Sequence, residues 1–175
     1  MIKIQKFKKS NLDEVISVLK KAFYKEGKSD KYNEWNFAKR ILDDNGYIKD
    51  LCFKALYNKK IVGYNILTKA DINNKVGLVL GPLAVLPDYQ KRSIGKRLVK
   101  YSIKEAKRLN YPWIIVLGGP YYKQFGFKKA LDYNIIIEKG SPINEHLKIL
   151  SLNKKVPKGK IKFCNSFYDE NGKLL

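Results

Sequence analysis

The stretch from Leu80 to Phe127 constrains the fold of this chain more than any other. It opens with an apolar run, Leu83-Ala84-Val85-Leu86-Pro87, and continues through a basic loop at residues 90–97 into a helical pattern of apolar residues. Backbone N–H groups at a helix start point outward, and the helix dipole adds partial positive charge there. The sequence therefore predicts a strand, an anion-binding loop and a helix, with a phosphate-bearing ligand at the carboxyl end of the strand.

Two motifs in this stretch carry a family resemblance. The loop reads Gln90-Lys91-Arg92-Ser93-Ile94-Gly95, and a later segment reads Tyr122-Lys123-Gln124-Phe125-Gly126-Phe127. The first resembles the pyrophosphate loop of the GNAT superfamily of N-acetyltransferases, Gln/Arg-x-x-Gly-x-Gly/Ala, and the second resembles its Tyr-x-x-x-Gly-Phe signature. Residues 117–127 are most similar to the YhbS-like branch. The chain departs from the pattern at Ser93, which replaces the first loop glycine, and by one residue fewer between Pro120 and Tyr121.

The resemblance implies a GNAT fold of the α+β class, with α/β/α layers around a mixed, mostly antiparallel sheet. Two parallel strands of that sheet would splay apart to admit coenzyme A, and acetyl-CoA would be the acyl donor. Main-chain groups of Leu83 to Val85 would pair with the pantetheine arm as an added strand does. The residues that the resemblance places at the donor are Leu83, Ala84, Val85, Gln90, Lys91, Arg92, Ser93, Ile94, Gly95, Lys96 and Gly118.

The resemblance also places a general acid on Tyr122, four residues before Gly126. Acetyl transfer to an amine expels a thiolate, and a hydroxyl near the sulfur can protonate it. A tyrosine with a pKa of about 10 is protonated at neutral pH and so can supply that proton. Two alternatives stay open: Tyr122 as a core residue beside Phe125 and Phe127, and Tyr121 as the acid.

The sequence does not identify the group that takes the proton of the amine. The strand expected at 76–85 carries no carboxylate. Glu26 and Glu34, in the helix pair that forms the acceptor wall in this family, and water relayed through the main chain are the alternatives. The single histidine, His146, lies in a polar segment where we expect a surface or packing role.

The composition favours one folded N-acetyltransferase domain over residues 1–175, in the cytoplasm. Of the 175 residues, 45% are hydrophobic and 13% aromatic, which is enough for a core. No apolar run approaches the roughly 20 residues of a membrane-spanning helix. Cys52 and Cys164 are far apart and lack a CxxC pair, so we expect neither a disulfide framework nor a metal site.

The formal net charge of +20 has two interpretations. A charge of this size attracts nucleic acid or an anionic membrane through a long-range field. Lysine, however, occurs singly or in pairs along the whole chain, and arginine, the better bidentate reader of phosphates, is scarce. We therefore expect no membrane partner and do not favour nucleic acid.

Hydrophobic periodicity and turn residues predict the other elements. In the first half we expect a strand at 2–7, a helix at 11–24 with a capping box of Ser10 and Asp13, a helix at 34–42, a hairpin of strands 51–57 and 61–68, a turn at 71–75 and a strand at 76–85. In the second half we expect a helix at 93–110, a buried parallel strand at 113–117, one helical turn at 121–125, a strand at 133–138, a helix at 144–152 and an edge strand at 160–164.

Together these features predict an acetyl-CoA-dependent enzyme that moves an acetyl group to a primary amine by direct attack in a ternary complex. The acceptor would be a small molecule or a protein, and the resemblance also allows a homodimer. Two rival functions stay open. Ser93 and the unidentified base suggest a catalytically impaired acyl-CoA-binding module, and the charge suggests a protein associated with nucleic acid or the ribosome.

Overall fold

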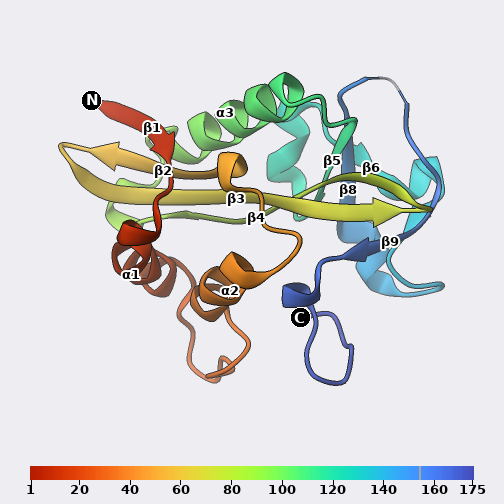
Figure 1. The fold of residues 1–175 in the computed structure, drawn as a ribbon, viewed down its shortest axis with the longest axis horizontal. Coiled ribbons are helices and arrows are strands. Elements are labelled where there is room, and N and C mark those ends of the chain that lie inside the picture. The colour runs from red at the N-terminus through yellow and green to blue at the C-terminus, as the bar shows by residue number, and fades with distance from the viewer. Residues whose placement is uncertain (154) are drawn as a thin grey trace.

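The computed structural model describes residues 1–153 and 155–175. A long sheet forms the middle layer. Helices α1 (Leu12–Phe23) and α2 (Glu34–Arg40) cover one face, and helix α3 (Ile94–Arg108) covers the other (Figure 1). This arrangement confirms the predicted α/β/α layers.

The sheet is mostly antiparallel, as predicted. Over the described residues its strands follow the order β1-β2-β3-β4-β5-β8-β6, and β9 pairs with β3 and β7 beside this path. The strands are β1 (Ile2–Lys6), β2 (Cys52–Tyr57), β3 (Lys60–Ile72), β4 (Lys75–Val85), β5 (Trp113–Leu117), β6 (Lys128–Lys129), β7 (Ile135–Ile136), β8 (Leu147–Ser151) and β9 (Gly159–Phe163). Only β4 with β5 and β7 with β9 run parallel among these pairs.

Two tight turns set the register of the long strands. Asn58 and Lys59 join β2 to β3 with φ angles of 47° and 68°, and Asn73 and Asn74 join β3 to β4 with φ angles of 50° and 61°. Two-residue hairpin turns of type I′ need the left-handed region at both central positions, and asparagine tolerates it well. The first hairpin is therefore confirmed, whereas the predicted turn at 71–75 is wrong in length, because β3 continues to Ile72.

Helix α3 is fixed to the sheet by both apolar and polar contacts. Leu98 and Val99 are fully buried, and burial of such a side chain stabilises the fold by about 1.5–3 kcal/mol. The Nδ2 of Asn65 on β3 donates to Ser102 Oγ at 2.7 Å, and that hydroxyl donates to the carbonyl of Leu98 at 2.9 Å. The start of α3 thus has a defined position over β3 and β4.

The predicted ends of the first two helices need correction. Asn11, rather than Ser10, stands at the N-cap of α1, and the capping box with Asp13 does not form. The Oδ1 of Asn11 instead accepts from the backbone N–H of Lys8 at 3.2 Å and from Lys54 Nζ at 2.6 Å. Helix α2 ends at Arg40, and a 3-10 turn follows it.

The helix predicted at 144–152 is wrong. Residues Leu147–Ser151 form β8, antiparallel to β5, and a 3-10 turn at Pro142–His146 precedes it. Leu147 and Ile149 are buried at alternate positions of β8, which is the period of a strand. His146 ends the 3-10 turn and is exposed, as expected.

Of the strand predicted at 133–138, only Ile135–Ile136 is extended, as β7. Residues Ala130–Tyr133 form a 3-10 turn, and Asn134 is left-handed with φ 57°, so the extended segment begins only at Ile135. Strand β9 forms near the predicted 160–164 but is no edge strand, because it pairs with both β3 and β7. The helical turn predicted at 121–125 is present as a 3-10 turn, Pro120–Phe125.

Candidate active site

Strand β4 is irregular at Gly81 and Pro82. Leu80 lies opposite Leu67 of β3, and Leu83 lies opposite Asn65, so β4 carries one extra residue between these pairs. Such a bulge bends a strand and ends regular pairing. Pairing of β4 with β5 is in fact confined to residues 78–80 and 114–116.

The end of β4 therefore has one edge that no strand of the described chain occupies. Leu83 to Val85 stay paired with β3, while β5 has already separated from β4. The predicted divergence of the two parallel strands, β4 and β5, is observed, and it lies where the sequence predicts the ligand. An extended chain could add to this edge through main-chain hydrogen bonds.

The loop that follows β4 has an unusual backbone. Lys91 and Ser93 are both left-handed, with φ angles of 60° and 61°, and α3 begins immediately after them. Left-handed residues in a turn let successive N–H groups converge on one concavity, which favours anions. The first turn of α3 contains no acidic side chain, and Lys96 and Arg97 add positive charge near its start.

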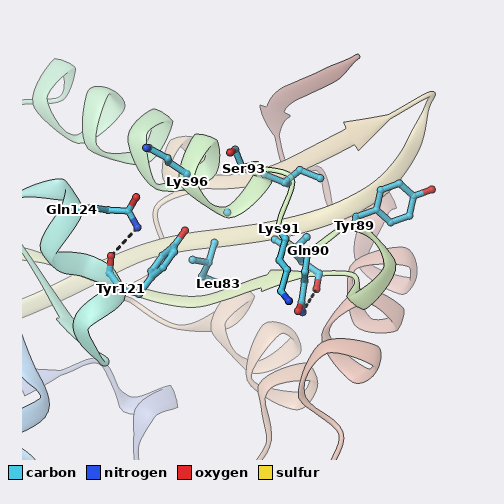
Figure 2. A pocket seen from close by; sticks show the side chains of 11 residues that line it. Leu83, Tyr89, Gln90, Lys91, Ser93, Lys96, Tyr121 and Gln124 are labelled. Carbon is cyan, nitrogen blue, oxygen red and sulfur yellow. Dashed lines mark hydrogen bonds between the residues drawn. The ribbon is translucent and has the colours of Figure 1, made fainter.

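A cavity of about 500 Å³ lies between this loop, the end of β4 and the 3-10 turn at Pro120–Phe125 (Figure 2). It brings together most of the residues predicted to bind the donor: Leu83, Val85, Gln90, Lys91, Ser93, Ile94, Gly95 and Lys96. Tyr89, Tyr121 and Gln124 also line it, and the sequence patterns did not assign them to the donor. The amide Nε2 of Gln90 donates to the carbonyl of Val85 at 3.2 Å and so ties the loop to the strand.

Three residues predicted at the donor lie outside the lining of this cavity. Ala84 is buried, and its position in the register is opposite Tyr64. The guanidinium of Arg92 lies over the ring of Tyr89, 5.2 Å from its centroid. Gly118, at the end of β5, accepts a hydrogen bond from Lys148 Nζ through its carbonyl.

The two neighbouring tyrosines occupy different places. Tyr121 lines the cavity, and its hydroxyl points toward the first turn of α3 (Figure 2), where a Cβ added to Gly95 would lie 3.1 Å from it. Tyr122 packs against Phe127, with ring centroids 5.8 Å apart, and against Gly118 at the end of β5. Burial raises the pKa of Tyr122 to about 12 and also raises the pKa of Tyr121. Both phenols are therefore protonated at neutral pH.

A second cavity, of about 380 Å³, adjoins the same strand just before the first one. Residues 79–82 of β4 and Leu117 of β5 form its floor, and side chains from residues 28–40 and from the tail complete it. Pro82 lines this cavity and Leu83 lines the first. The linings of the two cavities thus include consecutive residues, Pro82 and Leu83, at the bulge of β4, where β4 and β5 diverge.

Glu34 is the one acidic side chain among the described residues that line the second cavity. Its two carboxylate oxygens accept from Lys28 Nζ at 2.8 and 2.6 Å, and this amine also donates to the carbonyl of Phe23 at 3.0 Å. Glu26, the other carboxylate considered from the sequence, is exposed and does not line the cavity.

Comparisons with known proteins place this architecture in a family. Residues 49–129, which include both sequence motifs, match the model of the acetyltransferase (GNAT) domain. An uncharacterized N-acetyltransferase of Escherichia coli, YjhQ, is 29% identical over 114 residues, which are 62% of this chain and 60% of that protein. Residues 49–129 thus correspond to an acetyltransferase (GNAT) domain.

Two solved GNAT structures have the same fold as this chain. The Brucella melitensis GNAT acetyltransferase, solved with acetyl-CoA, superposes with a TM-score of 0.79 at 20% identity and covers 95% of this chain and 98% of its own. The YhbS N-acetyltransferase of Escherichia coli, solved with CoA, has a TM-score of 0.82 at 18% identity, with 95% and 91% covered. At this identity the likeness is one of fold, and it confirms the GNAT fold expected from the motifs.

Within residues 1–153 and 155–175, no three His, Cys, Asp or Glu side chains are grouped as metal ligands. No helix in the same residues has the length and apolar character needed to cross a bilayer.

Sequence reasoning missed much of the second cavity. Tyr32 precedes α2, Arg40 is the last residue of α2, and Phe167 comes from the tail. No local motif links these residues, because only tertiary packing brings the tail to α2, where Phe37 and Phe167 have ring centroids 4.8 Å apart.

Proposed function

We propose that this chain, as one domain over residues 1–175, transfers an acetyl group from acetyl-CoA to a primary amine by direct attack in a ternary complex. The observation that carries the proposal is the bulge of β4, at which an anion-favouring cavity and a second cavity adjoin one strand. A donor and an acceptor that enter from the two cavities would meet there.

The donor would lie in the first cavity. Its pyrophosphate would bind the N–H groups of the loop and the amines of Lys91 and Lys96, because charge-assisted hydrogen bonds to phosphate are strong. Its pantetheine arm would pair with the unoccupied edge at Leu83 to Val85. The thioester would then reach the point where β4 and β5 diverge.

The reaction itself is a transfer between two nucleophiles. The amine nitrogen attacks the thioester carbon, the tetrahedral intermediate collapses, the C–S bond breaks and the thiolate takes a proton. We assign that proton to Tyr122, since its ring lies against the end of β5 beside the expected thioester. Tyr121 is the alternative acid, although its hydroxyl lies at the first turn of α3, on the phosphate side of the cavity.

The attacking amine must lose a proton, because an amine with a pKa of about 10.4 is almost wholly protonated at neutral pH. We assign the removal of this proton to Glu34, which would act directly or through a water. The support is the position of this carboxylate in the second cavity, on the side from which the acceptor would enter.

Calorimetric titration tests the donor half of the proposal. Acetyl-CoA should bind with micromolar affinity and more tightly than adenosine diphosphate, because only the full donor can pair with β4. An amine panel would then be assayed for release of free CoA thiol. Absence of acetyl-CoA binding, or binding equal to that of adenosine diphosphate, would overturn the proposal.

A further inference from the structure

Arg40 lies at the C-terminal end of α2 and lines the second cavity. Its guanidinium donates to two backbone carbonyls, from Nη1 to Lys31 at 3.3 Å and from Nη2 to Ser166 at 3.1 Å. None of the ion pairs among the described residues includes it. Arginine keeps its charge in proteins, so the cavity wall contains a cation without an anionic partner.

The environment of Arg40 removes part of its water. Its Cζ lies 5.6 Å from the ring centroid of Tyr32 and 6.0 Å from that of Phe37, and burial lowers its pKa. A partly desolvated cation gains more from a bound anion than an exposed one does, because solvent screens the interaction less.

Lys28, the other cation that lines the cavity, is paired with an anion. Lys28 is neutralised by Glu34 through two hydrogen bonds, and its Nζ also lies 5.8 Å from the ring of Trp35. Asp44 lies outside the cavity lining, and it accepts from the N–H of Ser166 at 2.8 Å and from the hydroxyl of Ser166 at 2.7 Å. Of the cationic side chains that line the cavity, Arg40 is therefore the one without an ion-pair partner among the described residues.

Most of the remaining lining is apolar. The rings of Phe37 and Phe167 meet edge to face at 4.8 Å, and both line the cavity beside Leu117 and Pro82. The volume of about 380 Å³ is that of a small-molecule site. Such a cavity suits a ligand with an apolar body and one anionic group.

We propose that the acceptor is a small amine that also bears a carboxylate and an apolar side chain, and that Arg40 binds the carboxylate. This inference rests on the proposed N-acetyltransferase function. The amine would point to the bulge at Pro82, and the apolar body would lie against Phe37 and Phe167. A polyamine would bring a second cation to Arg40 and is disfavoured by repulsion.

Matched amines with and without a carboxylate test the inference directly. Phenylalanine would be compared with phenethylamine, and leucine with 3-methylbutylamine, by release of CoA thiol from acetyl-CoA. We expect kcat/KM to be about tenfold or more higher for each carboxylate-bearing member, as a hydrogen bond to a charged group allows. The ratio within a pair does not depend on the fraction of active protein.

Variants of α2 then locate the effect. Arg40→Met should reduce the carboxylate preference about tenfold, mainly through KM, whereas Arg40→Lys should keep part of it. Lys39→Met is the matched control, because Lys39 is exposed on the same helix and does not line the cavity. Its preference should equal that of the wild-type protein, and acetyl-CoA affinity should be the same in all variants.

The outcomes separate this inference from the proposed function. Equal or better acetylation of the decarboxylated amines, or an unchanged preference in Arg40→Met, would overturn the inference and leave the transferase standing. Failure of every amine to be acetylated or to bind the CoA-saturated protein by calorimetry would also overturn it. Failure of acetyl-CoA itself to bind would overturn the proposed function. In that case, calorimetry of the four amines with the protein alone would still show whether carboxylate binding depends on Arg40.

Discussion

The ring of Tyr122 lies so close to Gly118 that a Cβ added to Gly118 would stand 2.5 Å from ring carbon Cε2. Real Cβ contacts are longer than this, so any side chain at 118 would displace the ring. The absence of a side chain at Gly118 thus leaves the space that the ring of Tyr122 occupies. If Tyr122 is the general acid, as proposed, Gly118 helps to position it.

Gly118→Ala should lower kcat and leave acetyl-CoA affinity nearly unchanged, because the ring of Tyr122 must shift while the loop at 90–96 stays in place. Steady-state kinetics and calorimetry would measure the two effects. Gly119→Ala is the matched control, since a Cβ there meets nothing within 4 Å. Equal kinetics for the two variants would contradict the positioning role.

Tyr122→Phe should reduce kcat by about a hundredfold, the lower part of the range for loss of a general acid. The ring and its contact with Phe127 are kept, so folding should be unaffected. Tyr121→Phe should retain most of kcat. The reverse pattern would assign the acid to Tyr121, and full kcat in both variants would show that neither phenol is the general acid.

The raised pKa of Tyr122 predicts a change of stability with pH. The phenol ionises near 10 in the unfolded chain and at about 12 in the fold, so between these values the unfolded state loses protons that the folded state keeps. Stability should therefore fall as pH rises above 10, by up to about 1.4 kcal/mol per pH unit from this group. Urea unfolding of the wild-type protein and of Tyr122→Phe at pH 9 to 11 should show a shallower decline in the variant; equal slopes would contradict the assigned pKa.

Ser93→Gly should leave acetyl-CoA affinity within about threefold, because backbone N–H groups form the anion site whatever the side chain. It should also relieve left-handed strain of about 1–2 kcal/mol, partly offset by the greater freedom of glycine in the unfolded chain. Ser93 has φ 61° and ψ 15°, and its side chain makes no capping hydrogen bond. Calorimetry and urea unfolding would measure both effects. A loss of affinity of about tenfold, shared by Ser93→Ala, would show instead that the hydroxyl binds phosphate.

Glu34→Gln should lower kcat by about a hundredfold at neutral pH, if its carboxylate takes the proton of the amine. Glu26→Gln removes a carboxylate that lies outside the cavity and should leave kcat unchanged. Recovery of the Glu34→Gln rate at high pH, where the amine is already deprotonated, would support the role. An equal defect at all pH values would point to the lost contact with Lys28 instead.

Most of the lining of the first cavity could be predicted because the residues that form it are close in the sequence. Strand, loop, helix and second strand follow one another between Leu80 and Phe127, and each has its own periodicity or turn residues. The divergence of β4 from β5 was expected from the resemblance alone. Its physical cause, one extra residue near Pro82, appears only in the register with β3.

The errors occurred where tertiary pairing decides between two patterns. Leu147 and Leu150 are spaced as in a helix, but Leu147 and Ile149 alternate as in a strand, and pairing with β5 selects the strand. The wall of the second cavity was missed for a related reason. Arg40 and Phe167 are far apart in the sequence. The tail packs against α2 through tertiary contacts that no sequence motif predicts.

The boundary between Pro82 and Leu83 has an evolutionary consequence. Residues 79–82, with α2 and the tail, line the second cavity, while residues after the boundary line the first. Under the proposed function, substitutions at Arg40 or Phe167 would therefore alter substrate choice without disturbing the residues of the donor cavity. Descendants of such a chain, or variants made in the laboratory, would then diversify their substrates by changes in α2 and the tail, two segments far apart in the sequence.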